Sequence, residues 1–226
     1  MNCAAPDYRK LTLSNIRSQE FKHVLLLLYW PVYGLMFLYF ERLRTGCTYH
    51  TVESVLDEFI PFIPQFIIPY FGWFVYLIGG QILFFFRDVN TFKKSMWFVI
   101  ITYSVTSLIY FVYPTQQELR PVIEGQGIFE KIVSGLYVFD TNTNVCPSIH
   151  VLGSMAICFS ALNSELFKGK YAKILNVVTA LLISFSTVFL KQHSIIDVIW
   201  AFVLSFAVYP VCCICFAGNI RRNGVV

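Results

Sequence analysis

AKILNVVTALLISFSTVFL (172–190) and IIDVIWAFVLSFAVYPVCCICF (195–216) are two apolar runs that only KQHS (191–194) separates. Each run is close to the roughly 20 mostly apolar residues that a helix needs to cross the hydrocarbon core of a bilayer. The polar residues between them are then expected at a membrane face. This stretch predicts two neighbouring transmembrane helices joined by a polar turn.

Four earlier runs have the same character. They cover residues 22–40, 66–86, 95–113 and 148–163, and the last is the shortest. Of the 226 residues, 57% are apolar and 13% are charged, whereas a soluble domain carries roughly 25% charged residues. A soluble protein of this size has too little interior for 23 phenylalanines, so lipid must be the solvent for much of the chain. We expect an all-α, polytopic membrane protein with about six transmembrane helices.

The six runs also predict the domain boundaries. A membrane catalytic domain is expected at residues 22–216, between a cytoplasmic N-terminal segment (1–21) and a cytoplasmic tail (217–226). The first apolar run begins at Val24 and lacks a small-residue cleavage site. It is therefore interpreted as a retained helix and not as a removed signal peptide.

A further segment, residues 51–66, lies between the first two runs and mixes acids, aromatic residues and prolines. That composition is typical of a segment that lies at the membrane interface on the outer side. Within it, Glu53 and Asp57 share a helical face without a histidine partner. A solvated face is the expected interpretation, and a metal site is the alternative.

The basic residues predict the orientation. If six runs cross, twelve of the 17 basic residues fall on the side of the N-terminus. The other five are Arg42, Arg44, Arg120, Lys131 and Lys191. The positive-inside rule then places the N-terminus in the cytoplasm. The net charge of +4 is small and scattered, so a surface that binds nucleic acid is not expected.

Three polar segments fall on the outer side in this topology: YPTQQELRP (113–121), CPSIH (146–150) and STVFLKQHSIID (186–197). They bring five functional side chains to one membrane face: Arg120, Ser148, His150, His193 and Asp197. Ionisable groups near hydrocarbon are costly, so such a group is a functional hypothesis.

The spacing of His193 and Asp197 predicts a contact between them. Residues four apart share one face of a helix, and a carboxylate that accepts the Nδ1–H of an imidazole leaves Nε2 free as a nucleophile or base. The alternative is a structural ion pair at a helix start.

The other two segments predict an anion site. Pro147 and Ser148 open a span, where free backbone N–H groups bind anions, and His150 lies in its first turn. The alternative is a capped helix with an interfacial histidine. Arg120 is a candidate planar cation for phosphate, and the alternative is a solvated loop arginine.

These segments resemble the type 2 phosphatidic acid phosphatase superfamily. Its pattern is Lys, six residues, Arg-Pro; then Pro-Ser-Gly-His; then Ser-Arg, five residues, His, three residues, Asp. The resemblance covers residues 95–216 and implies a membrane enzyme that acts on lipid phosphates. It implies that His193 attacks phosphorus, giving a phosphohistidine, while Asp197 holds its ring and His150 protonates the leaving oxygen. No metal or other cofactor is implied.

The chain departs from this pattern at three positions. Tyr113 stands at the lysine, Ile149 at the glycine and Thr187 at the second arginine, and Lys191 is a candidate substitute cation. The candidate phosphate-binding residues are thus Arg120, Ser148, Ile149, Thr187 and Lys191. Fewer cations suit a phosphodiester better than a monoester dianion. The variant motifs also look like the branch that contains inositol phosphorylceramide synthases, which transfer a phosphorylated head group to an alcohol.

The expected function is a lipid phosphatase that acts from the outer or lumenal face, most simply in a bacterial plasma membrane. A head-group phosphotransferase is the first alternative, and a degenerate lipid-binding protein without catalysis is the second. Cys47 and Cys146 both face outward, and a disulfide between them is a further possibility in an oxidising compartment.

Overall fold

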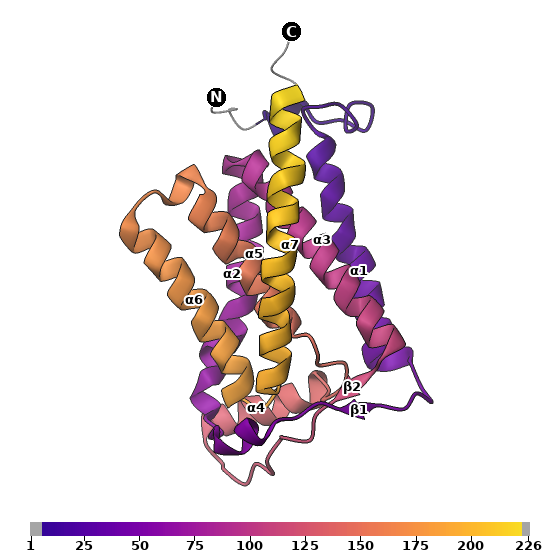
Figure 1. Cartoon of the computed structure of the whole chain (residues 1–226), viewed down its shortest axis with the longest axis vertical. Helices are drawn as coiled ribbons and strands as arrows, with labels where there is room; N and C mark the ends of the chain where they lie inside the picture. The colour runs from indigo at the N-terminus through magenta and orange to yellow at the C-terminus, as the bar shows by residue number, and fades with distance from the viewer. Residues whose placement is uncertain (1–5, 223–226) are drawn as a thin grey trace.

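The computed structural model of the protein describes residues 6–222, with side chains described up to Ile214. The chain forms a bundle of helices that run between two ends (Figure 1). Five helices are long and apolar enough to cross a membrane, namely Lys22–Leu43, Pro64–Arg87, Val89–Val112, Lys170–Phe189 and Ile195–Ile214. The prediction of an all-α polytopic membrane protein is confirmed.

The sixth predicted run is the short helix α5 (Ile149–Asn163), and it occupies the centre of the bundle. Its 15 residues span about 22 Å at 1.5 Å each, less than the roughly 30 Å of a hydrocarbon core. All residues from 150 to 161 are buried. The helices packed around it are α2 (Ile67–Arg87), α3 (Val89–Val112), α6 (Lys170–Phe189) and α7 (Ile195–Arg222). Because these neighbours cover α5 instead of lipid, it need not match the bilayer thickness.

The observed helix ends differ from the predicted ones by a few residues. The first span is continuous from a 3-10 helix (Lys22–Leu28) through α1 (Tyr29–Leu38) to a π-helical turn (Tyr39–Leu43). Helix α3 begins six residues before the predicted position 95, because the Asp88 side chain accepts a hydrogen bond from the Thr91 backbone N–H at 3.0 Å. Such a cap satisfies one of the free N–H groups at a helix start.

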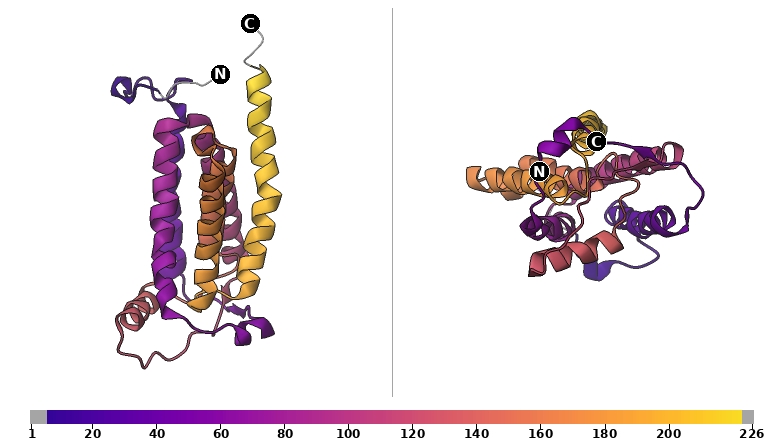
Figure 2. Two further views of the ribbon diagram at one scale, coloured as in Figure 1. Left: turned by 90° about the vertical axis from the view of Figure 1, so that its left-hand side faces the viewer. Right: turned by 90° about the horizontal axis from the view of Figure 1, so that it is seen from below.

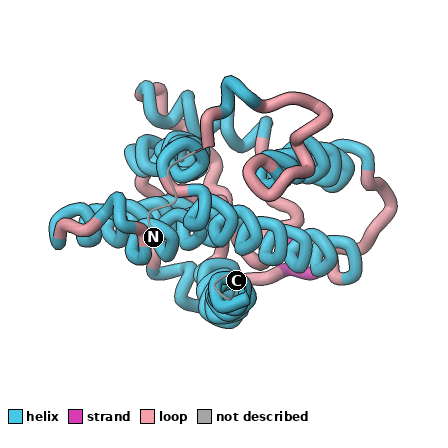
Figure 3. Tube along the Cα trace, turned by 90° about the horizontal axis from the view of Figure 1, so that it is seen from above, coloured by secondary structure: helices cyan, strands magenta, loops and turns pink. Residues whose placement is uncertain are grey.

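Both ends of the described chain, residues 6 and 222, lie at the same end of the bundle (Figure 1). Helix α7 stands at one side when the bundle is viewed from that end (Figure 3). The predicted 217–226 tail is helical as far as Arg222, and residues 1–5 and 223–226 of the predicted terminal segments lie outside the described residues.

The opposite end of the bundle carries the long connections (Figures 1 and 2). There, strand β1 (His50–Thr51) pairs in parallel with β2 (Thr115–Gln116). This pairing joins the connection before α2 to the connection after α3. Helix α4 (Ile128–Phe139) lies across this end (Figure 1). The 51–66 segment forms a short 3-10 helix, Val55–Phe59, whose apolar side chains are largely exposed, as suits an interfacial segment.

Candidate functional site

The turn between α6 and α7 holds His193 and Asp197 in contact. Nδ1 of His193 lies 3.1 Å from Oδ2 of Asp197, and both side chains are buried. The same carboxylate oxygen accepts the backbone N–H of Ser194 at 3.0 Å. Because this carboxylate acts as an acceptor, Nδ1 is the natural donor and Nε2 keeps its lone pair. The four-residue spacing therefore brings the two side chains together as predicted.

The backbone of this turn is fixed by the end of α6. The N–H groups of Gln192 and His193 both donate to the carbonyl oxygen of Thr187, at 2.9 and 3.1 Å. Lys191 takes the left-handed conformation with φ +53°, which lets the chain reverse direction within a few residues. The imidazole of His193 thus extends from a short turn in which the backbone N–H groups of residues 190–194 are all hydrogen-bonded.

Asp57, from the interfacial 3-10 helix, braces the same turn from outside. Its carboxylate accepts the Ser194 hydroxyl at 2.6 Å and the backbone N–H of Ile195 at 2.8 Å. Its backbone carbonyl accepts the Lys191 ammonium at 2.7 Å. The expectation that Asp57 belongs to a solvated face is wrong, since only 1% of it is exposed. The free N–H groups at the start of α7 favour a carboxylate, and Asp57 caps one of them, that of Ile195.

His150 enters the site from the first turn of α5. Its ring contacts both Tyr70 and Trp73 of α2, and the ring centroids are 4.5 Å apart in each pair. Within the described residues its Nδ1 has no hydrogen-bond partner. Ser148 is the N-cap residue of α5, and its buried hydroxyl likewise has no partner there. Its backbone N–H donates to the Asp197 carbonyl at 3.2 Å, which ties the starts of α5 and α7 together.

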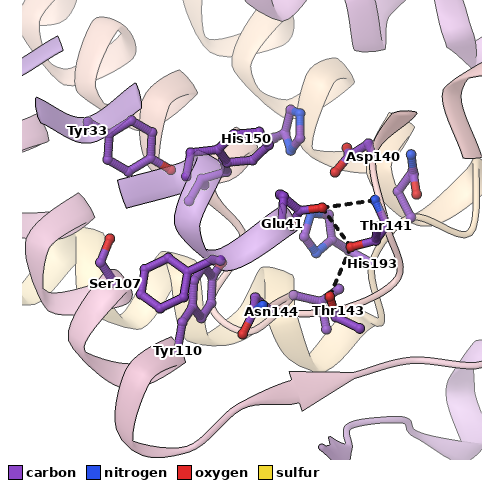
Figure 4. A pocket seen from close by; sticks show the side chains of 15 residues that line it. Tyr33, Glu41, Ser107, Tyr110, Asp140, Thr141, Thr143, Asn144, His150 and His193 are labelled. Carbon is purple, nitrogen blue, oxygen red and sulfur yellow. Dashed lines mark hydrogen bonds between the residues drawn. The ribbon is translucent and has the colours of Figure 1, made fainter. Parts of the chain in front are cut away.

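The two histidines lie next to one another at the same cavity. Their ring centroids are 5.7 Å apart in a T-shaped arrangement, and both side chains line this partly open cavity (Figure 4). Ile149 also lines it. Among the described residues, no group of three histidine, cysteine or acidic side chains is placed to hold a metal ion.

Arg120 lies behind the wall of this cavity. Its guanidinium donates to the carbonyl oxygens of Tyr137 and Asp140, at 3.0 and 2.7 Å, and to the side-chain oxygen of Gln192. It also stacks on the Tyr137 ring at 4.5 Å. Burial lowers the pKa of Arg120, while the Asp140 charge raises it. Arg120 therefore connects the end of α4 to the residue beside His193.

The other two candidate phosphate ligands point elsewhere. The Thr187 hydroxyl donates to the Ser184 carbonyl one turn back in α6, at 2.8 Å. The Lys191 ammonium is engaged by Asp57 as described, and burial lowers the pKa of Lys191. Tyr113, at the lysine position of the resembled pattern, stacks on His50 with centroids 4.0 Å apart.

The thiols of Cys47 and Cys146 are both free. Burial, and secondly the charge of Asp197, raises the pKa of the Cys146 thiol. Such a thiol stays protonated and reacts slowly.

Several residues at the cavity were not identified from the sequence. They include Glu41, Asn144 and Gln192, and Tyr70 stands behind His150. A carboxylate at the end of an apolar run was the available hint for Glu41. The others belong to loops or helix faces whose sequence resembles any polar connection or aromatic span.

A sequence model of the PAP2 superfamily matches residues 97–221, more than half of the chain. The match contains the arginine, the two histidines and the aspartate described above. No curated protein and no solved structure matches the chain.

Proposed function

The chain belongs to the PAP2 superfamily, and on that basis we propose that it is an integral membrane lipid phosphatase that works through a phosphohistidine at His193. The observation that carries the proposal is the arrangement of His193 and His150 on one cavity, with Asp197 behind His193. These groups supply a nucleophile, an orienting carboxylate and a proton donor, as displacement at phosphorus requires. The site would face the outer or lumenal side of the membrane, most simply a bacterial plasma membrane.

The reaction balances in two displacements. The Nε2 lone pair of His193 attacks phosphorus, the bond from phosphorus to the lipid oxygen breaks, and protonated His150 gives its proton to that oxygen. Neutral His150 then takes a proton from water as the water oxygen attacks phosphorus. The His193–phosphorus bond breaks and the product leaves. The Ser148 hydroxyl and the N–H groups of the first turn of α5 would hold the phosphoryl oxygens.

A phosphotransferase is the second candidate, and one observation favours it. In the described part of the chain no lysine or arginine lines the cavity, so a phosphodiester with one negative charge is better matched than a monoester dianion. An alcohol would then replace water in the second displacement, as in the inositol phosphorylceramide synthases that the motifs resemble.

The purified protein in detergent micelles, given a panel of lipid phosphates, tests these proposals. A phosphatase releases inorganic phosphate, whereas a transferase moves the head group to added diacylglycerol or ceramide without releasing it. His193→Ala should reduce turnover at least about 1,000-fold, since the nucleophile is lost. His50→Ala is the matched control, because His50 stacks on Tyr113 away from the cavity lining. Unchanged turnover in His193→Ala would remove the proposed nucleophile.

A further inference from the structure

The charged groups that line the cavity beside the two histidines are acidic. Glu41, at the outer end of the first span, and Asp140, just after α4, both line it (Figure 4). Asp140 accepts the Tyr70 hydroxyl at 2.8 Å, and the Tyr70 ring touches His150. One carboxylate therefore lies a single ring away from the proposed proton donor.

Glu41 keeps neutral hydrogen-bond donors as its partners. It accepts the Thr141 hydroxyl at 2.7 Å and the Thr141 backbone N–H at 3.3 Å. The neighbouring Arg42 is directed away, donating to the Phe139 carbonyl at 2.9 Å. The charge of the nearby Arg120 acts on that of Asp140, although its hydrogen bond goes to the Asp140 backbone carbonyl. Within the described residues Glu41 makes no ion pair, although the charges of Arg42 and Arg120 act on it from a greater distance.

Aromatic rings form the wall next to Glu41. Tyr33, Phe37, Phe40 and Tyr110 line the same cavity, and Phe40 meets Tyr110 edge to face with centroids 6.0 Å apart. Aromatic faces beside a carboxylate attract ammonium groups, and quaternary ammonium ligands above all. A dianionic or purely apolar head group gains nothing from that combination.

Two buried amide side chains in the cavity lining have unused hydrogen-bonding groups. Asn144 is 7% exposed, and neither its Oδ1 nor its Nδ2 has a partner within the described residues. The side-chain Nε2 of Gln192 is likewise buried and has no hydrogen-bond partner within the described residues. Buried polar groups are normally satisfied, so such groups indicate a polar ligand. Neutral N–H donors suit the oxygens of a singly charged phosphodiester.

We propose that this cavity binds a zwitterionic phosphodiester lipid, whose head group carries an amine or quaternary ammonium. Phosphorus lies between His150 and His193, its oxygens accept from Asn144 and Gln192, and the positive nitrogen faces Glu41 and the aromatic wall. This substrate class rests on the His193 and His150 chemistry of the proposed function, and it favours the phosphodiester of the second candidate over a monoester. His193 attacks phosphorus, the bond to the diacylglycerol oxygen breaks, and His150 protonates that oxygen. Diacylglycerol leaves, and the phosphorylated head group departs with water or an alcohol.

Head-group preference tests the proposal in mixed micelles that contain equal amounts of phosphatidylcholine, phosphatidylethanolamine, phosphatidylglycerol or phosphatidic acid. Diacylglycerol formation from either zwitterionic lipid, phosphatidylcholine or phosphatidylethanolamine, should exceed that from the other two by at least about ten-fold. Glu41→Gln keeps the shape and removes the charge, so it should reduce that ratio about ten-fold or more. Glu124→Gln, an exposed acid in the outer loop, is the control and should leave the ratio unchanged. Preference for phosphatidic acid, or a ratio that Glu41→Gln leaves intact, would overturn the proposal.

A binding measurement needs neither turnover nor the Glu41 variant. Glycerophosphocholine should bind the His193→Ala protein at least about ten-fold more tightly than glycerophosphoglycerol in isothermal titration calorimetry. Equal or weaker binding contradicts the proposed head group. Loss of all turnover in His193→Ala together with an unchanged head-group ratio in Glu41→Gln would remove this inference alone. Unchanged turnover in His193→Ala would remove the proposed function instead.

Discussion

At the scale of single residues, Asp57 holds the turn that carries His193 although it belongs to a distant part of the chain. It accepts hydrogen bonds from the Ser194 hydroxyl and from one backbone N–H, that of Ile195, at the start of α7. Hydrogen bonds to a charged group contribute about 1.5–3 kcal/mol each. Asp57 is therefore a positioning residue, and it acts on chemistry through the backbone of residues 191–195.

Asp57→Asn should weaken both stability and turnover. The amide presents an NH₂ group to donors that need an acceptor, which should cost about 1–3 kcal/mol of unfolding free energy. A displaced imidazole should lower kcat about ten-fold or more while KM changes little, because the cavity lining is intact. Thermal unfolding in detergent and steady-state kinetics measure the two effects.

Glu58→Gln is the matched control for that prediction, since Glu58 is the exposed neighbour on the same 3-10 helix. It should behave as wild type. If Asp57→Asn raised KM and left kcat unchanged, the positioning role would be refuted.

Single residues also show which contacts could be predicted from the sequence and which could not. His193 and Asp197 were found because residues four apart in the sequence can meet locally, although His193 lies in the turn before α7 and not on the helix. Asp57 was missed because its partner Ser194 is 137 residues away, and no local pattern encodes a contact of that range. Arg120 was found as a cation, but its carbonyl partners became visible only in the structure.

At the scale of elements, the fit of α5 against α2 and α3 places His150. A Cβ atom at Gly153 would lie 2.6 Å from the Tyr103 hydroxyl and 2.9 Å from Nε1 of Trp73. Tyr103 donates to the Ile149 carbonyl, and the Trp73 ring touches His150. Glycine is thus required where the helices approach beside the site.

Gly153→Ala should therefore disturb packing and activity together. An extra methyl group in a closely packed core costs about 1–3 kcal/mol, and here it displaces the rings that hold His150. The midpoint of thermal unfolding and the turnover rate should both fall. Gly79→Ala is the control, because a Cβ atom there meets nothing within 4 Å. Equal behaviour of the two variants would refute this account of the α5 packing.

Elements were predicted well where apolar runs are long, and less well at their ends. The span at 95–113 starts earlier than predicted because a single capping side chain, Asp88, fixes the start of α3. The shortness of α5 was visible in the sequence. The position of α5 at the centre of the bundle could not be predicted, because a helix buried by other helices and a helix exposed to lipid have the same apolar composition.

At the scale of the whole molecule, the bundle separates two faces. The candidate site and the long connections lie at one end, and both ends of the described chain lie at the other (Figure 1). The basic residues predicted this separation by their bias toward the side of the N-terminus. The cavity could not be predicted, because it forms between the first span, the loop before α5 and the turn before α7.

Single-cysteine labelling should give the orientation of the bundle. In a protein whose own cysteines are replaced, Glu124→Cys at the site end should react with a membrane-impermeant maleimide in intact cells. Lys170→Cys at the opposite end should react only after permeabilisation, since both positions are exposed and a membrane separates them. The reverse pattern would place the site in the cytoplasm.

The most direct test of the account is to trap the covalent bond between His193 and phosphorus. We predict that enzyme quenched in alkali during turnover of a lipid phosphate carries an acid-labile adduct, which tandem mass spectrometry places on His193. Its mass identifies phosphate alone or the phosphorylated head group. The His50→Ala protein should carry the same adduct. Steady turnover with His193 unmodified, or an adduct on another residue, would contradict the central claim.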